Sequence, residues 1–268
     1  MNKIETILTD SIKSLIKHSS SPAKIKSLEE KHIVKLHFIP YKYRVFGGIL
    51  QSMNIQFGNF IEKVMDEVIT DNPNNEIIRK YSGKKSNNFA LSKKSDSLID
   101  SYITSCQIGN YTEDELLQNF NNLILNINKN EADASNETAH FKHDVDILFR
   151  EKSTDIYYYV EIKYNDDHDT GKFVDINRKL LKTYAYLQRE LGEDKILKPI
   201  LFYFNNKKMK GNIYLPENQV IYRGKRFFDT FTNIRYEDMD AYMKNISESP
   251  ETIQAFNDLY NKIVRTDN

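Results

Sequence analysis

Residues 143–163 read HDVDILFREKSTDIYYYVEIK and hold the clearest structural pattern in the chain. Two apolar runs of strand length, 145–149 and 156–162, flank a short charged segment at 150–155. Apolar and β-branched runs on either side of a polar turn are typical of a β-hairpin. The sequence therefore predicts two antiparallel strands joined by this turn.

Charged residues occupy defined positions within the predicted hairpin. Side chains alternate between the two faces of a strand, so Asp144 and Asp146 should share one face of the first strand. Glu161 and Lys163 should share a face of the second strand by the same rule. Because burying carboxylates without a partner is costly, a divalent metal is one reason to gather them there. A solvated strand face with an incidental Glu–Lys pair is the structural alternative.

The segments that follow the hairpin indicate a layered α/β core. Residues 173–191 have helical periodicity, and 200–204 form an apolar run typical of a strand buried on both faces. A helix between two strands permits a parallel crossover, whereas the hairpin is antiparallel. We therefore expect a mixed central sheet flanked by helices, with extra helices at the N- and C-terminal ends.

The N-terminal half is expected to be mostly helical. Apolar residues recur at helical spacing over 2–18 and over 43–69, the second pattern with expected interruptions near Gly47 and Gly48 and at Gly58. Residues 79–94, which carry six basic side chains, are expected to form a polar loop.

Later segments give weaker local signals. Thr112 and Glu115 predict a capping box that opens a helix through 125 or 127, and a polar loop should follow over 128–140. Residues 212–215 and 219–222 are strand candidates, and 226–264 is mostly helical in pattern. No composition shift marks a boundary, so we expect a single domain of 1–268, with a helical part to about 130, a core at about 140–235 and C-terminal helices at 236–268.

Composition sets limits on the class of protein. The chain has 268 residues, 40% of them hydrophobic, and 38 basic residues balance 38 acidic ones. Neutral total charge gives no argument for nucleic acid by itself, although local patches count for more. The single cysteine, Cys106, excludes an intrachain disulfide framework and is expected to be a core residue. With no apolar run of membrane length, we expect a cytoplasmic protein without a membrane partner.

The arrangement of Asp146 with Glu161-Ile162-Lys163 is chemically the most informative. Hard oxygen ligands on adjacent strands suit Mg²⁺, which binds through one or two carboxylates together with phosphate and water. A lysine two residues beyond the glutamate reaches the same place and can stabilise developing phosphate charge. Short D…ExK matches also arise by chance. His140 and His143 lack a second ligand pair, so we do not expect zinc.

At these residues the chain resembles the PD-(D/E)XK nuclease superfamily, particularly type II restriction endonucleases, and within them a HinfI-like group. The similar segments are VDILF and YYYVEIK for the catalytic strands, KLLKTYAYL for the following helix and ILKPILFYF for the third strand. LQSMNIQFGNFIEKVMDEVI resembles the first helix of that core, and IYRGKRFFDTF a segment after it. The proline that often precedes the first aspartate is absent, because Val145 stands there.

The resemblance implies roles for individual residues. Asp146 and Glu161 would be metal ligands, Lys163 the catalytic lysine, and Glu62 the additional helix glutamate, with Asp144 as the competitor for the first position. It implies Mg²⁺-dependent, sequence-specific hydrolysis of double-stranded DNA leaving 5′-phosphate ends. It also implies a homodimer, in a restriction-modification system with a cognate DNA methyltransferase. The basic segments 79–94, 205–210 and 223–226, with the loop 166–172, are then candidates for phosphate contact.

Two other functions remain open at this point. A repair or recombination nuclease of the same superfamily would cut according to DNA structure instead of sequence. A non-catalytic DNA-binding protein would carry an accidental or degenerate D…ExK pattern and would cleave nothing. Cleavage into discrete bands, or a neighbouring methyltransferase gene, would favour the restriction enzyme over both.

Overall fold

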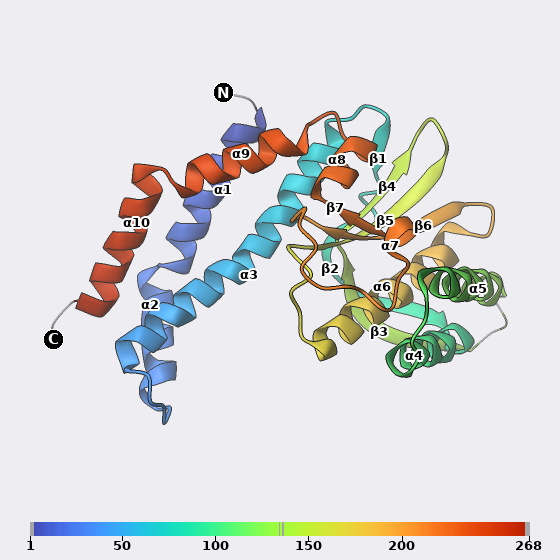
Figure 1. Cartoon of the computed structure of the whole chain (residues 1–268), viewed down its shortest axis with the longest axis horizontal. Helices are drawn as coiled ribbons and strands as arrows, with labels where there is room; N and C mark the ends of the chain where they lie inside the picture. The colour runs from blue at the N-terminus through green and yellow to red at the C-terminus, as the bar shows by residue number, and fades with distance from the viewer. Residues whose placement is uncertain (1–2, 134, 136, 266–268) are drawn as a thin grey trace. The chain divides into compact units, whose positions relative to one another are not determined.

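The structure of the protein is a computed structural model that describes residues 3–133, 135 and 137–265 (Figure 1). The described chain forms two compact units. One, the helical unit, contains residues up to 68 and from 234 onward. The other, the sheet unit, contains residues 69–233.

The sheet unit is built on a mixed sheet with the strand order β1-β4-β5-β6-β7 among the described residues. β1, β4 and β5 pair antiparallel, while β5, β6 and β7 pair parallel. This confirms the hairpin, the parallel crossover and the mixed α/β core. The strands are β1 (Asn75–Ile77), β4 (Ile147–Glu151), β5 (Ile156–Lys163), β6 (Ile196–Tyr203) and β7 (Ile221–Arg223).

A second sheet of two antiparallel strands, β2 (Gly83–Ser92) and β3 (Thr138–Val145), lies in the same unit. The chain leaves β3 at Val145, bends at Asp146 and enters β4 at Ile147. The expectation of a polar loop over 79–94 is wrong for most of that segment. Pairing with β3 satisfies the backbone of β2, and Phe89 and Leu91 are buried on its inner side.

Helices cover both faces of the main sheet. α4 (Lys93–Ile108), α5 (Glu113–Ala132) and α6 (Thr170–Leu191) pack together and share a hydrophobic core with one face. The core includes Tyr159 from β5 and Leu201 from β6. On the other face, Phe202 lies 4.5 Å from Phe227 of α8 (Gly224–Phe231), centroid to centroid. Alternation along β6 thus gives each helical layer its own apolar side chains.

The helical unit contains a small hydrophobic core between helices from the N-terminal and C-terminal parts of the chain. Ile25, Leu28, Ile49, Met53 and Leu259 are among its buried residues. The helices are α1 (Lys3–Ser19), α2 (Pro22–Ile33), α3 (Tyr41–Thr70), α9 (Tyr236–Ser247) and α10 (Pro250–Tyr260), followed by the π-helical turn Asn261–Arg265.

α3 runs without interruption, so the expected breaks at Gly47, Gly48 and Gly58 are wrong. Glycine lowers helix stability but does not end a helix whose apolar face is buried. At Gly48 the missing side chain has a packing role. A Cβ there would come within 3.0 Å of Leu28 Cδ2 and 3.2 Å of His32 Nε2. Gly48 therefore permits the close approach of α2 to α3.

Other local expectations have mixed outcomes. The Thr112–Glu115 capping box is present, but its helix α5 continues to Ala132. Residues 212–215 form no strand, whereas 221–223 form β7. The short element α7 (Glu217–Val220) precedes β7. Through 3–133, 135 and 137–265, no helix combines the length and apolar character that a membrane crossing requires.

Candidate active site

Asp146 stands where the chain passes from the small sheet to the main sheet. Its Oδ2 accepts a hydrogen bond of 2.7 Å from the backbone N–H of Ile162 in β5. The ladder between β4 and β5 ends at the pair Ile147 and Val160. Beyond this pair, the bend leaves the N–H of Ile162 without a backbone acceptor in β4. The Asp146 carboxylate accepts its hydrogen bond instead.

Glu161 is buried in β5, with its side chain 3% exposed. Tyr159 Oη donates to Glu161 Oε2 at 2.7 Å, and Lys163 Nζ donates to Oε1 at 2.7 Å. His143 Nε2, from β3, lies 3.4 Å from Oε2. Tyr159, Glu161 and Lys163 share one strand face because they are two residues apart. Three side chains from two sheets thus fix the orientation of this carboxylate.

Lys163 closes the cluster at the C-terminal end of β5. Its ammonium donates to the backbone carbonyl of Ile162 at 2.8 Å and lies 3.8 Å from Asp146 Oδ2, besides its bond to Glu161. The side chain is 24% exposed, so this is the solvent-accessible side of the cluster. Asp146, Glu161 and Lys163 are therefore brought together as the sequence predicts, and we call them the carboxylate–lysine cluster.

Burial and neighbouring charges shift the pKa values of the groups in and around the cluster. Burial by itself raises the pKa of Glu161, but the positive charge of Lys163 and the hydrogen bonds from His143 and Lys163 outweigh it, and the net pKa is lowered. Burial, followed by the charges of Glu161 and Asp146, raises the pKa of Tyr159 well above its ordinary value. Glu161 is thus held as a carboxylate, and Tyr159 as a neutral hydrogen-bond donor.

Asp144 has a different environment from Asp146. Its Oδ1 accepts a hydrogen bond of 2.9 Å from the backbone N–H of Lys85 in β2. His143 contacts Glu161, and side chains alternate along β3, so Asp144 points to the other side of the strand. In one continuous strand the two aspartates would share a face, but the bend at Asp146 interrupts this alternation. The geometry favours Asp146 at the cluster.

The donor set of the cluster suits Mg²⁺. Three oxygens surround the Lys163 ammonium. Two are carboxylate oxygens of Asp146 and Glu161, and the third is the backbone carbonyl oxygen of Ile162. Mg²⁺ prefers hard oxygen ligands such as carboxylates, and it takes its remaining ligands from water and phosphate. Within the described ranges no group of three or more His, Cys, Asp or Glu residues is arranged to hold a metal. Asp146 and Glu161 are the carboxylates of the cluster that would hold a magnesium ion.

Glu62 lies in α3, in the helical unit, and its side chain is half-buried. Its role as an additional glutamate stays a prediction.

The loops after β5, β6 and β7 are tied together beside the cluster. Asp166 is 1% exposed and accepts from the backbone N–H groups of Met209 and Lys210, at 2.9 and 3.2 Å. Arg223 Nη2, at the end of β7, donates to Asp166 Oδ2 at 3.0 Å. Because parallel strands end at the same edge of the sheet, one carboxylate can join loops that are far apart in sequence. This clamp fixes the edge that carries Lys163.

The basic segments differ in how their side chains are used. Arg223 is bound to Asp166, and Arg226 donates to the backbone oxygens of Glu217, Asn218 and Ile221. Arg223 is therefore held within the fold, whereas Arg226 is exposed and stays a candidate for phosphate contact although its guanidinium binds backbone oxygens. The lysines of 207–210 are exposed on the loop after β6 and stay candidates for the backbone of a nucleic acid.

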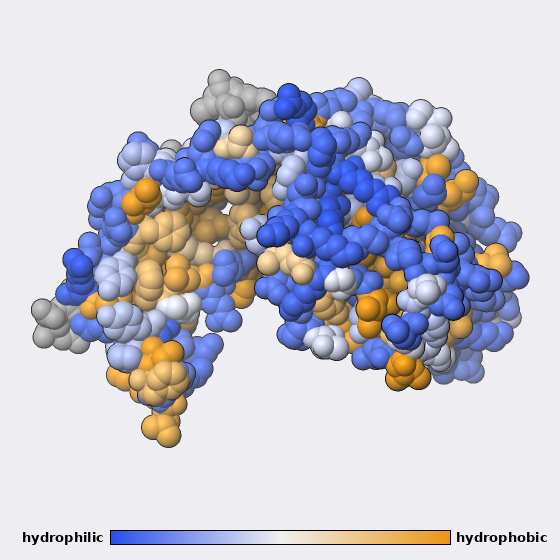
Figure 2. All heavy atoms as spheres, in the orientation of Figure 1, coloured by the Kyte–Doolittle hydropathy of each residue, from blue (hydrophilic) through white to orange (hydrophobic). Residues whose placement is uncertain are grey.

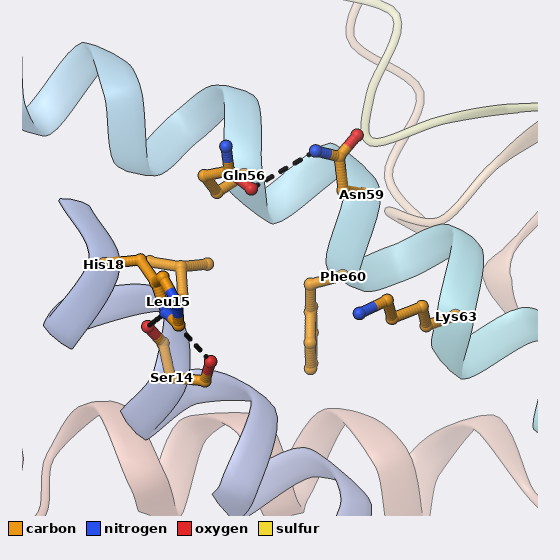
Figure 3. A pocket seen from close by; sticks show the side chains of 7 residues that line it. All are labelled: Ser14, Leu15, His18, Gln56, Asn59, Phe60 and Lys63. Atoms are coloured by element: carbon orange, nitrogen blue, oxygen red, sulfur yellow. Dashed lines mark hydrogen bonds between the residues drawn. The ribbon is translucent and has the colours of Figure 1, made fainter. Parts of the chain in front are cut away.

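A separate hollow of about 260 Å³ lies in the helical unit (Figure 3). Its lining comes from α1 and α3 and contains no carboxylate. In the view of Figure 3, Gln56 and Asn59 are joined by a hydrogen bond of 3.2 Å on α3, opposite His18 and Ser14 of α1. With amides, an imidazole and a lysine but no acid, this hollow is not a candidate for the metal. Its lining residues are Ser14, Leu15, His18, Gln56, Asn59, Phe60 and Lys63.

Sequence reasoning missed three contacts of the site. Tyr159 was not singled out from the sequence, although its position two residues before Glu161 already placed both on one face. His143 carried no signal for its contact with Glu161, because that contact depends on how the small sheet meets the main sheet. The pairing of Asp166 with Arg223 joins residues 57 positions apart and had no local signature.

Comparison with known proteins gives two concordant matches. The family model described as "Type II restriction endonuclease, HinfI" matches residues 1–247. The chain is 54% identical to the type II restriction enzyme HinfI of Haemophilus influenzae over 265 residues, which covers 98% of each chain. No solved structure matches the chain significantly.

Proposed function

The chain belongs to the HinfI family of type II restriction endonucleases, and from this membership we propose that the carboxylate–lysine cluster is the place where it cuts double-stranded DNA. The family confirms the expectation of a sequence-specific deoxyribonuclease. It also removes the two alternatives, a structure-specific repair nuclease and a non-catalytic binding protein.

The observation that carries the proposal is the position of Lys163. Its ammonium lies 2.7 Å from Glu161 Oε1 and 3.8 Å from Asp146 Oδ2, at the accessible end of a parallel strand. Two carboxylates and one ammonium held within contact distance match what hydrolysis of a phosphodiester requires: oxygen ligands for a cation and a positive charge for the phosphate. Ligand sites of open α/β sheets lie at the carboxyl ends of the strands, where Lys163 stands.

Each side chain has a distinct task in this proposal. Asp146 and Glu161 would hold Mg²⁺, which when bound acts as a Lewis acid toward the phosphate and lowers the pKa of water. Lys163 stabilises the negative charge that develops on the phosphate and orients the attacking water. Tyr159 and His143 hold the Glu161 carboxylate in a single orientation. Attack of water at phosphorus with departure of the 3′ oxygen would leave 5′-phosphate ends.

Partners and setting belong to the same proposal. A palindromic duplex site is two-fold symmetric, which favours an isologous homodimer with one cluster per strand. A cytoplasmic enzyme of this activity needs a cognate DNA methyltransferase to protect the DNA of its own cell. Glu62 is proposed as an additional glutamate of the site on the resemblance of its helix alone.

Unmethylated phage DNA with Mg²⁺ provides the test. Wild type should give discrete bands, while Lys163→Ala and Glu161→Ala should give none under the same conditions. Lys179→Ala, which removes an exposed lysine from an i,i+4 pair on α6, is the matched control and should leave the bands unchanged. Wild-type banding by either cluster variant would refute the assignment of the site. End-labelling of the products would show whether the 5′ ends carry phosphate.

A further inference from the structure

The loop between α2 and α3 exposes an unusual run of large apolar side chains. Residues 33–39, here called the α2–α3 tip, run from the last residue of α2 to just before α3 begins. Figure 2 shows this loop, at the lower left of the view, largely in the orange of hydrophobic residues. Its five large apolar residues are exposed: Ile33 68%, Val34 81%, Leu36 104%, Phe38 91% and Ile39 38%. Contiguous apolar exposure of this kind marks an interaction surface.

The charged side chains within the tip and at the positions that directly flank it in sequence are basic. Between Glu30 and Glu62 the sequence contains no aspartate or glutamate. Lys35 and His37 alternate with the exposed Leu36 and Phe38 within the tip itself. Desolvation, followed by the charges of Lys35, Arg44, Lys31 and His37, lowers the pKa of His32. An apolar surface with basic side chains between its apolar ones fits an anionic partner.

The tip is also supported by the helices that carry it. Arg44 Nη1 in α3 donates to the backbone oxygen of Lys35 at 2.9 Å. The backbone N–H of Ile39 donates to His37 Nδ1 at 2.9 Å, and the His37 and Phe38 rings stack with centroids 4.9 Å apart. The close packing of α2 on α3 at Gly48 stabilises the pair of helices that carries the tip. A surface held in one conformation loses little conformational freedom when it binds.

We propose that the α2–α3 tip contacts duplex DNA, with Leu36 and Phe38 against the bases in a groove and Lys35 at a neighbouring phosphate. Apolar side chains pressed between base steps, with basic residues on the backbone, are an established way of gripping a duplex. The proposal rests on the proposed function, in that duplex DNA is the substrate. It adds a contact element in the helical unit, outside the cluster that cuts.

A second copy of the chain fits the tip less well. Two tips meeting each other would bring Lys35 and its basic neighbours against their own copies, with no acidic residue in 31–61 to compensate. Like charges brought together at an interface oppose association. DNA phosphates remove this repulsion, and their displaced counterions add to the affinity.

Binding of the full-length protein to a 30-base-pair duplex containing the cleavage site tests the proposal, by fluorescence anisotropy in EDTA. The double variant Leu36→Ala/Phe38→Ala should bind at least about tenfold more weakly than wild type. Lys35→Ala should bind more weakly and reduce the slope of log K against log salt by about 1. Ile253→Ala, which removes an exposed isoleucine from α10, is the control and should bind as wild type does. Thermal melting should be unchanged, because the altered side chains lie in solvent.

Cleavage separates this proposal from the one on which it rests. If wild type cuts phage DNA with Mg²⁺ and the double variant binds and cuts as well as wild type, the tip proposal is overturned and the proposed function is not. Wild type that does not cut would overturn the proposed function. A sedimentation coefficient of the DNA-free double variant that differs from wild type would assign the tip to a second copy and overturn its contact with DNA.

Discussion

The hydroxyl of Tyr159 donates to Glu161 Oε2 at 2.7 Å, from two residues earlier on the same strand. Both side chains are buried, so this bond is made away from water. It leaves Glu161 Oε1 to Lys163 and joins the carboxylate to the hydrophobic core beneath it. The strand that presents the charged groups thus also supplies the residue that orients them.

Tyr159→Phe should weaken both the fold and the reaction. Without the hydroxyl, a buried carboxylate oxygen loses a donor, which costs about 1–3 kcal/mol of unfolding free energy. Cleavage should slow about 10- to 100-fold, because Glu161 is less firmly oriented. Urea unfolding and single-turnover cleavage measure the two effects. Tyr157→Phe, on the same strand face, is the matched control. Equal behaviour of the two variants would contradict the orienting role.

Asp146→Asn and Asp144→Asn should differ sharply. The first removes charge from the residue that contacts Ile162 and Lys163, and cleavage should fall by more than about 100-fold. The second alters a residue bonded to the backbone of Lys85, and cleavage should change only a few-fold. Initial rates on a plasmid substrate with Mg²⁺ provide the measurement. Loss of activity in Asp144→Asn with retention in Asp146→Asn would reverse the assignment.

Removal of divalent metal should stop cleavage without unfolding the protein. Lys163 already balances the Glu161 carboxylate through a contact of 2.7 Å, so the cluster does not depend on a cation for its stability. In EDTA we expect no bands, an unchanged melting temperature by circular dichroism, and full recovery of cleavage when Mg²⁺ is added. A large fall in melting temperature in EDTA would show instead that a metal holds the fold.

Asp166→Asn should destabilise the protein far more than Asp167→Asn. Asp166 is 1% exposed, and its loss leaves Arg223, 11% exposed in its side chain, with only the more exposed Glu217 as a counter-charge. Breaking such a pair costs about 3–5 kcal/mol. Asp167 pairs with Lys210 at 52% exposure, where a salt bridge contributes about 1 kcal/mol or less. Guanidinium unfolding of both variants gives the comparison, and equal midpoints would refute the clamp.

Two adjacent glycines of α3 should respond oppositely to a methyl group. At Gly47 a Cβ meets nothing within 4 Å, so Gly47→Ala should stabilise the helix by about 0.5–1 kcal/mol. At Gly48 it would press on Leu28 and His32, and Gly48→Ala should be about 1–3 kcal/mol less stable than Gly47→Ala. Thermal and urea unfolding test the pair. Equal stability of the two variants would mean that α2 does not pack closely at Gly48.

The secondary structure around the site could largely be predicted from local pattern. The hairpin, the helix after it and the buried third strand follow from periodicities that covalent geometry imposes on strands and helices. β2 was missed because much of its sequence, GKKSNNFALS, is polar, and only pairing with β3 makes it a strand. The break expected in α3 was wrong because helix propensity is weaker than the packing of a buried helical face.

By itself, the sequence determined that Tyr159, Glu161 and Lys163 stand on one strand face, since a two-residue period is a property of every extended chain. Only the tertiary structure decided that Asp146, not Asp144, faces Lys163, because a bend between two sheets breaks that period at Asp146. It alone brought His143 to Glu161 and Arg223 to Asp166. Contacts of this kind depend on which strand edges and loop ends meet, and no local pattern records that.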